Sequence, residues 1–270
     1  MSSAGPLPSA NPAARSAQGS PVSSATPILS VHGVGKHFGA FVALKDVTVS
    51  FPAGQLTAII GPNGAGKSTF FNLISGAFAP SSGQVIFEGR DITGMAQHLF
   101  ARQGIAKSFQ ITHVFKQLSA HENVRVAAQM RGARFALFKP RSALRGLAEA
   151  TDSLLERVGL ADVAHKLAAD LAHGQQRALE IAMALAADPR LLLMDEPTAG
   201  MSPEETTVMM DLITRIAQER TVVLVEHKMK LVMGICQRLV VLHHGELLAE
   251  GTPEEIRNNS EVKRVYLGQH

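Results

Sequence analysis

The stretch Gly61-Pro62-Asn63-Gly64-Ala65-Gly66-Lys67-Ser68-Thr69 decides the fold. Its spacing, a glycine, four residues and then Gly-Lys-Ser, is that of a phosphate-binding P-loop. The apolar run Leu56–Ile60 precedes it and a helix-like run, residues 70–77, follows it, which is the strand–loop–helix context that the motif requires. The glycines let the backbone turn several N–H groups toward one point, where the helix start adds the positive end of its dipole. The stretch therefore predicts a phosphate site rather than a glycine-rich turn with a chance lysine.

The side chains of this loop predict the ligand. We expect all nine residues to line a bound nucleoside triphosphate, with Lys67 reaching the β- and γ-phosphates and the Ser68 hydroxyl ligating Mg²⁺. Kinases, GTPases and motors use such loops too, so the class of protein depends on other residues.

The composition limits the number of domains, the cellular compartment and the relation to a membrane. The chain has 270 residues, 46% of them hydrophobic, which is enough for one large or two modest domains with a sizeable core. Its single cysteine, Cys236, cannot form an internal disulfide, lies in an apolar helical context and fits a reducing cytosol. No apolar run approaches the ~20 residues of a membrane span. We expect a soluble protein that acts against a membrane partner.

Positive charge is concentrated in one block. Residues 97–148 hold nine Lys or Arg against one acid, Glu122, whereas the rest of the chain has 17 basic and 22 acidic residues, a net charge of −5. The block is either a solvated basic face or a surface turned toward an anionic partner, such as lipid headgroups or nucleic acid.

The first half of the chain divides into three parts. Residues 1–27 are almost all Ser, Ala, Pro and Gly without an apolar block, which predicts a disordered tail and not a secretory signal. Residues 28–51 and 84–87 are strand-like, and 89–91 predict a turn. A capping box at residues 119–122 opens a helix toward Met130, and helices are predicted at 142–158 and 161–168. We interpret residues 111–172 as a helical subdomain inserted into a P-loop domain of residues 28–270.

The second half alternates helices and strands. Helices are predicted at 175–187, 203–219, 228–237 and 253–257, and strands at 191–194, 221–225, 239–242 and 247–250. Parallel strands linked by helices are typical of an α/β P-loop NTPase core.

An acidic strand end supplies the second chemical feature. The apolar run of residues 191–194 ends in Asp195 and Glu196, at the carboxyl edge of the sheet where a P-loop also lies. Asp195 would hold Mg²⁺ through its water shell and Glu196 would polarise the attacking water. Neighbouring side chains on an extended backbone point apart, so each carboxylate can take one role. The competing interpretation is a surface acidic pair.

Further residues resemble one family. The stretch Leu171-Ala172-His173-Gly174-Gln175, upstream of the acidic strand, resembles the signature motif of ATP-binding cassette (ABC) transporter ATPases. Phe38 matches the aromatic residue that stacks on adenine in that family, Gln110 the glutamine between the core and the helical subdomain, and His227 the histidine after the next strand. The resemblance covers residues 28–270. It implies an ABC ATPase fold, with an antiparallel β subdomain beside the core.

The resemblance also implies roles for these residues. Gln110 would offer its amide oxygen to Mg²⁺ or to the water, and His227 would hydrogen-bond the γ-phosphate and hold Glu196 in line. Residues 171–175 would act on ATP bound by another subunit, so two such domains would sandwich two nucleotides. Three positions depart from the pattern: Ala172 replaces the usual serine, His173 replaces a glycine, and the loop of residues 199–202 lacks its aspartate. Ser202 would cap the next helix instead.

The sequences of residues 171–177, 195–201 and 250–256 are similar to those of ATPases of branched-chain amino acid importers. Relatives in that branch serve urea, other amides and small acids. The resemblance implies a peripheral protein at the cytoplasmic face of the inner membrane, with permease subunits, a second identical or paralogous ATPase and, indirectly, a periplasmic binding protein as partners. Alternatives are the ATPase of a lipid or lipopolysaccharide exporter and a nucleic-acid ATPase. The latter has long coiled coils or paired heads, and neither is present, so we expect no nucleic acid partner.

Overall fold

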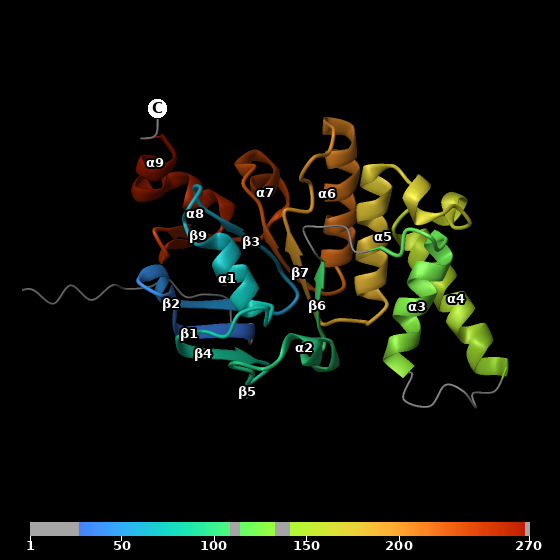
Figure 1. Cartoon of the computed structure of the whole chain (residues 1–270). Helices are drawn as coiled ribbons and strands as arrows, with labels where there is room; N and C mark the ends of the chain where they lie inside the picture. Colours follow the sequence, from blue (N-terminus) through green and yellow to red (C-terminus); the bar gives the residue numbers. More distant parts are fainter. Residues whose placement is uncertain (1–26, 109–113, 133–140, 268–270) are drawn as a thin grey trace, which may run out of the picture.

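Two β-sheets organise the part of the chain that the computed structural model describes, residues 27–108, 114–132 and 141–267 (Figure 1). The larger sheet has the strand order β10-β9-β3-β8-β7-β6. Its strands are β3 (Leu56–Ile60), β6 (Ile105–Ser108), β7 (Leu191–Asp195), β8 (Thr221–Val225), β9 (Arg238–His243) and β10 (Glu246–Gly251). All neighbours pair in parallel except β9 and β10, which are antiparallel.

The central strands are buried on both faces, because they alternate between two cores. Leu192 and Met194 of β7 belong to one hydrophobic cluster, and Leu191 and Leu193 belong to the other. Helices cover the first face: α5 (His173–Leu185), α6 (Pro203–Ala217) and α7 (Met229–Ile235). Such double burial explains the near-continuous apolar runs in these strands.

A four-stranded antiparallel sheet covers the other face, with α1 (Lys67–Ile74) between the sheets (Figure 1). Its strand order is β2-β1-β4-β5, from the strands β1 (Pro27–Phe38), β2 (Phe41–Pro52), β4 (Ser82–Phe87) and β5 (Arg90–Asp91). The side chains of Phe70 and Phe71 on α1 are completely buried in this layer. The predicted antiparallel β subdomain is thus confirmed.

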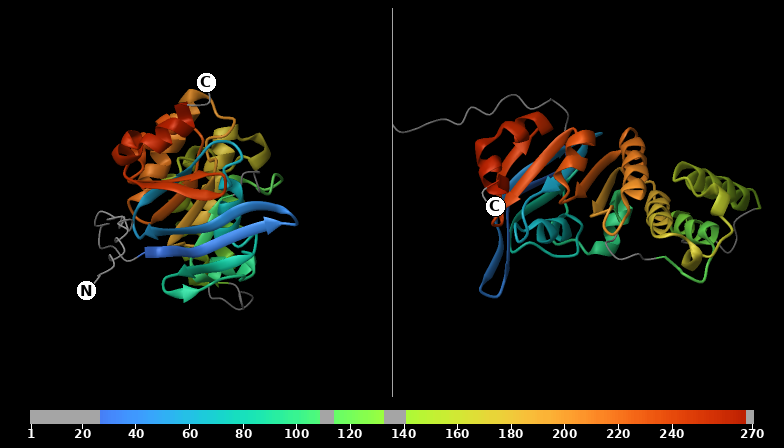
Figure 2. Two further views of the ribbon diagram at one scale, coloured as in Figure 1. Left: turned by 90° about the vertical axis from the view of Figure 1, so that its left-hand side faces the viewer. Right: turned by 90° about the horizontal axis from the view of Figure 1, so that it is seen from above.

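A helical arm extends from the end of the molecule that lies away from the antiparallel sheet (Figure 2). It contains α3 (Ala120–Gly132) and α4 (Arg141–Arg157), which pack on each other and on α5. The predicted capping box is present, because Ser119 Oγ accepts a bond from Glu122 N at 3.1 Å and Glu122 Oε2 accepts one from Ser119 N at 3.0 Å. Among the described residues, no helix is both long and apolar enough to cross a membrane.

Several sequence-based expectations were wrong in detail. The helix predicted at residues 161–168 is two short 3₁₀ turns, Ala161–Val163 and Ala168–Asp170. The turn predicted at 89–91 includes β5, which pairs back on β4. The helix after the P-loop starts at Lys67 rather than residue 70 and ends at Ile74, because Gly76 takes a φ of +74°. Helix α8 (Pro253–Asn258) was predicted, whereas α2 (Gln97–Gln103), α9 (Ser260–Leu267) and β6 were not.

Some expectations fall outside the described residues. These are the tail, of which Pro27 alone is described and begins β1, and most of the loop between the first two predicted helices.

The capping box of α3 yields a stability prediction. Ser119→Ala removes the hydroxyl that accepts the Glu122 N–H, so we expect the free energy of unfolding to fall by about 1 kcal/mol. Urea denaturation followed by circular dichroism measures this. Ser119→Thr keeps a capping hydroxyl and should stay closer to wild type. Equal stabilities for Ser119→Ala and wild type would show that the cap contributes nothing.

Candidate functional site

The P-loop connects β3 to α1 and is wedged between two other strands. A Cβ added to Gly61 would lie 2.3 Å from the carbonyl oxygen of Leu242 in β9, so a side chain is excluded there. Gly66 has a φ of +96°, and a Cβ on it would lie 2.9 Å from the carbonyl oxygen of Ala43 in β2. These close approaches fix the loop at the carboxyl edge of the large sheet.

The start of α1 is an open anion site. Its N-cap, Gly66, offers no side-chain hydrogen bond, and its first turn has no acidic residue. The N–H groups of a helical first turn have no partner inside the helix. Ser68 in that turn is exposed. These groups fit a phosphate with an associated cation.

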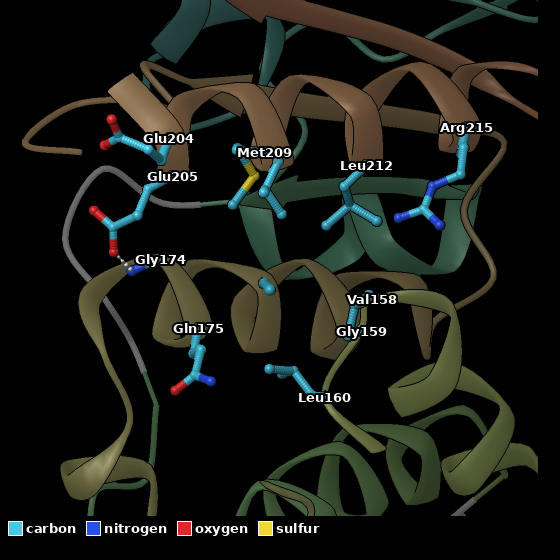
Figure 3. A pocket seen from close by; sticks show the side chains of 12 residues that line it. Val158, Gly159, Leu160, Gly174, Gln175, Glu204, Glu205, Met209, Leu212 and Arg215 are labelled. Carbon is cyan, nitrogen blue, oxygen red and sulfur yellow. Dashed lines mark hydrogen bonds between the residues drawn. The ribbon is translucent and has the colours of Figure 1, made fainter. Parts of the chain in front are cut away.

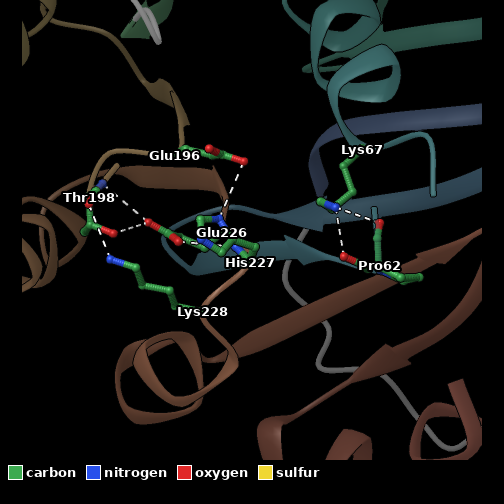
Figure 4. Close-up of polar contacts among 8 residues, drawn as sticks. Pro62, Lys67, Glu196, Thr198, Glu226, His227 and Lys228 are labelled. Carbon is green, nitrogen blue, oxygen red and sulfur yellow. Dashed lines mark hydrogen bonds and ion pairs between the residues drawn. The ribbon is translucent and has the colours of Figure 1, made fainter. Parts of the chain in front are cut away.

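Lys67 is folded against its own loop. Its Nζ donates to the carbonyl oxygens of Gly61, at 2.8 Å, and Pro62, at 2.9 Å (Figure 4). The side chain is buried. Burial lowers the pKa of Lys67, and the charge of Glu196 partly opposes this shift. The amine is therefore held beside the loop and electrostatically coupled to the acidic strand end.

Asp195 ends β7 as a buried carboxylate. Burial raises the pKa of Asp195 and nearby Glu196 adds to the shift, whereas Lys107 and Arg177 oppose it. Lys107, from β6, also bonds Asn72 Oδ1 at 2.8 Å and Ser75 Oγ at 3.2 Å on the P-loop helix. Lys107 and Arg177 were not predicted as site residues. Each is a charged residue within an otherwise apolar strand or helix face, and this pattern could have indicated them.

Glu196 leaves the strand in an unusual backbone conformation. Its φ is +44°, in the left-handed region, which costs on the order of 1–3 kcal/mol for such a residue. Its N–H donates to the Val225 carbonyl at 3.0 Å, and its own carbonyl accepts from Ala199 N at 3.0 Å. The expectation of an extended backbone at Glu196 was therefore wrong.

His227 meets Glu196 across the strand ends. His227 Nδ1 lies 3.6 Å from Glu196 Oε1 (Figure 4). His227 follows β8, which pairs with β7 on one side and with β3 on the other. The sheet thus brings together the two residues that the sequence analysis assigned to one reaction.

Glu226, which the sequence analysis did not select, lies beneath this pair. It is fully buried and accepts hydrogen bonds from Thr198 Oγ1 at 2.6 Å and His227 N at 3.2 Å. The sequence could have indicated Glu226, because it is an acidic residue at a strand end directly before His227.

Residues 171–175 form the start of α5. Gln175 Oε1 accepts from the N–H of Ala172 at 3.1 Å, and Gly174 N–H donates to Glu205 Oε1 at 3.2 Å (Figure 3). Bonds from the backbone of Ser202 and Gly174 lower the pKa of Glu205. Ser202 caps α6 as predicted, accepting from Glu205 N at 3.2 Å. Within the described part, no hydrogen bond or ion pair joins residues 171–175 to the P-loop of the same chain.

Phe38 lies at the tip of the β1–β2 hairpin, 45% exposed. Its ring packs edge-on against Phe78, with 5.6 Å between centroids, and Lys36 Nζ lies 5.1 Å from its centroid. Phe41, paired with it across the turn, is 67% exposed and was not predicted as a site residue. Gln110 lies outside the described residues.

The C-terminal helix α9 reaches the P-loop. Burial raises the pKa of Tyr266 to about 12, against the opposing effect of a hydrogen bond with the Gly61 backbone. The first glycine of the P-loop is therefore contacted from the end of the described chain.

A P-loop at the end of a middle strand, facing an acidic strand end two strands away, defines a nucleotide-binding protein of the P-loop class. The family model described as ABC transporter matches residues 44–199. The chain belongs to the ABC transporter family. A second model, described as branched-chain amino acid ATP-binding cassette transporter, matches residues 246–270.

Two relatives show how far the similarity extends. The chain is 40% identical over 251 residues to the high-affinity branched-chain amino acid transport ATP-binding protein LivG of Escherichia coli, covering 90% of this chain and 98% of that protein. It is 30% identical over 243 residues to the lipopolysaccharide export system ATP-binding protein LptB of Haemophilus influenzae, covering 90% and 98%.

A solved structure supports the fold. The ADP conformation of an ATP-binding cassette of an ABC transporter superimposes with a TM-score of 0.78, at 30% identity, covering 90% of this chain and 99% of that one. The predicted ABC ATPase fold is thus confirmed.

The raised pKa of Asp195 predicts a pH-dependent stability. Because burial raises its folded-state pKa above the usual 3.8, the ionised carboxylate costs folding free energy. That cost is absent below pH 3.8 and grows as the pH rises through this value toward the folded-state pKa. Asp195→Asn removes the charge, so we expect the variant to be more stable than wild type at pH 8.

Urea denaturation at several pH values measures this gain, which should shrink as the pH falls toward 4. A variant less stable than wild type at pH 8 would contradict the prediction.

Proposed function

We propose that the protein is the ATP-hydrolysing subunit of an importer for branched-chain amino acids or similar small polar solutes. The observation that carries the ATPase proposal is the contact between Glu196 and His227 at the sheet edge that also presents the P-loop. A nucleotide phosphate on α1 would face a carboxylate, a histidine and a lysine.

Each residue has a physical role in this proposal. The open N–H groups of α1 and the Lys67 amine, once released from the loop carbonyls, bind the phosphates. Ser68 and Asp195 would hold Mg²⁺, which prefers few protein oxygens together with phosphate and water and neutralises phosphate charge. Glu196 takes the proton of the attacking water, and His227 orients Glu196. Phe38 stacks on the base, and Gln110 contacts the metal or the water.

The similarities support import over export. Identity to LivG is 40% and to LptB 30%, and the second family model covers the C-terminal residues 246–270. The solute itself is recognised by other subunits. We infer transmembrane permease subunits as partners, with a periplasmic binding protein acting through them, and a place at the cytoplasmic face of the membrane.

A second ATP-binding subunit completes the site in this proposal. The start of α5 makes no bond to the P-loop of its own chain in the described structure, and its Ala172 and Gly174 N–H groups are bonded to Gln175 and Glu205. Residues 171–175 would meet the γ-phosphate bound by a partner, identical or paralogous, in a head-to-tail pair. Ala172 supplies no hydroxyl there, so the helix dipole and backbone N–H groups that exchange their bonds for the phosphate would make the contact.

The catalytic assignment is tested by Glu196→Gln. The amide keeps the shape but cannot take a proton, so we expect turnover to fall roughly 10²- to 10⁴-fold with ATP affinity retained, and ATP to trap a dimer. Steady-state hydrolysis, nucleotide titration and sedimentation measure the three effects. Lys67→Ala is the contrasting variant, because it should weaken nucleotide binding itself. Normal turnover by Glu196→Gln would refute the assignment.

A further inference from the structure

Glu226 is a buried carboxylate whose hydrogen bonds, within the described structure, go to the loops around the proposed catalytic pair. It is 0% exposed, at the end of β8. Its Oε1 accepts from Thr198 Oγ1 at 2.6 Å and from Thr198 N at 3.4 Å, and its Oε2 accepts from His227 N at 3.2 Å (Figure 4). Burying a carboxylate is costly unless donors surround it. We call this set of bonds the Glu226 bridge.

The Glu226 bridge joins two short segments, the turn after Glu196 and the start of the histidine loop, and it lies beside a longer contact from Lys228 Nζ to the Thr198 carbonyl oxygen at 3.5 Å. Thr198 stands in the turn that begins at Glu196, where φ is +44° and the carbonyl of Glu196 accepts from Ala199 N at 3.0 Å. His227 directly follows Glu226. A left-handed conformation at a glutamate persists only when surrounding contacts hold it. The bridge supplies such contacts within two residues of Glu196.

The side chains of the proposed catalytic pair lie close together beside the bridge. Glu196 Oε1 and His227 Nδ1 lie 3.6 Å apart, one on each side of the bridge. Both are partly exposed, so neither is confined by packing alone. We propose that Glu226 is a positioning residue: it holds the Glu196 turn and His227 in one register, so that both side chains address the same phosphate. This inference rests on the proposed ATPase function.

Only an acceptor with two oxygens fits this position. An ionised carboxylate accepts on both oxygens and donates nothing. In Glu226→Gln, an amide nitrogen facing His227 would oppose the N–H that Oε2 now accepts. If the amide nitrogen faced Thr198 instead, two donors would meet at the Thr198 N–H. The Thr198 hydroxyl could rotate and accept a hydrogen bond from the amide. The variant therefore loosens at least one arm of the bridge while keeping its volume.

Thr198→Val is the sharper variant, because it removes the 2.6 Å bond and keeps the side-chain shape. We expect kcat for ATP to fall roughly 10- to 100-fold, because small misplacements of catalytic groups cost rates of that size. The KM for ATP and the ATP affinity should stay within about twofold, since the P-loop is untouched. Thr198→Ser restores the hydroxyl and should recover most of kcat.

The chain offers a matched control. Thr57 on β3 is equally buried, and its hydroxyl has no hydrogen-bond partner in the described structure, so Thr57→Val makes the same change without breaking a bond. It should leave kcat unchanged. Combining Thr198→Val with Glu226→Gln should cost little more than the worse single variant, because both act on one bridge.

The experiment measures kcat, KM and thermal unfolding of the full chain and these variants. A lower kcat in Thr198→Val, with rescue by serine, supports the positioning role. An unchanged kcat with a lower unfolding temperature, or no rescue by serine, overturns it. A wild-type chain that binds ATP yet never hydrolyses it, alone or with its partners, would instead overturn the proposed function and this role with it.

Discussion

The parallel register of three strands is the constraint on which the site depends. Val225 of β8 pairs with Ile59 of β3 on one side and with Asp195 of β7 on the other. The next backbone hydrogen bonds keep the same register: Glu226 N donates to the Ile59 carbonyl, and Glu196 N donates to the Val225 carbonyl. The P-loop, the acidic strand end and the histidine loop therefore leave the sheet at one height. A shift of any strand by one residue would reverse its side chains and dismantle the site.

Around this edge the protein places charge in pairs of opposite sign. Lys67 lies within electrostatic range of Glu196, and Lys107 within range of Asp195. Burial lowers the pKa of both lysines, and each carboxylate opposes that shift. Lys107 also bonds the end of α1, so the P-loop helix and the acidic strand are coupled through one amine. A bound nucleotide and cation would enter an electrostatically organised site rather than create it.

Local sequence was enough to predict the parts of the fold with short-range causes. The P-loop pattern, the capping box at Ser119, the helix cap at Ser202 and the apolar strands could be predicted, because each depends on neighbours within a few residues. Features set by long-range contacts could not. The turn at Glu196, the Glu226 bridge and the bond from Gly174 to Glu205 join segments that no periodicity connects. Strand β6 was missed because Lys107 interrupts its apolar pattern, and the electrostatic coupling of Lys107 to Asp195 is a long-range effect.

In the proposed function, one catalytic site needs the P-loop of one chain and the α5 start of another. Mixing two inactive chains tests this directly: Lys67→Ala, with a damaged P-loop, and Gly174→Asp, whose new carboxylate would repel a phosphate at the α5 start. A mixed pair contains one site with both halves intact. ATP hydrolysis, negligible for each variant alone, should reappear on mixing and grow with protein concentration. A mixture that stays as inactive as its components, while wild-type chains at the same concentration hydrolyse ATP, would rule out a shared site.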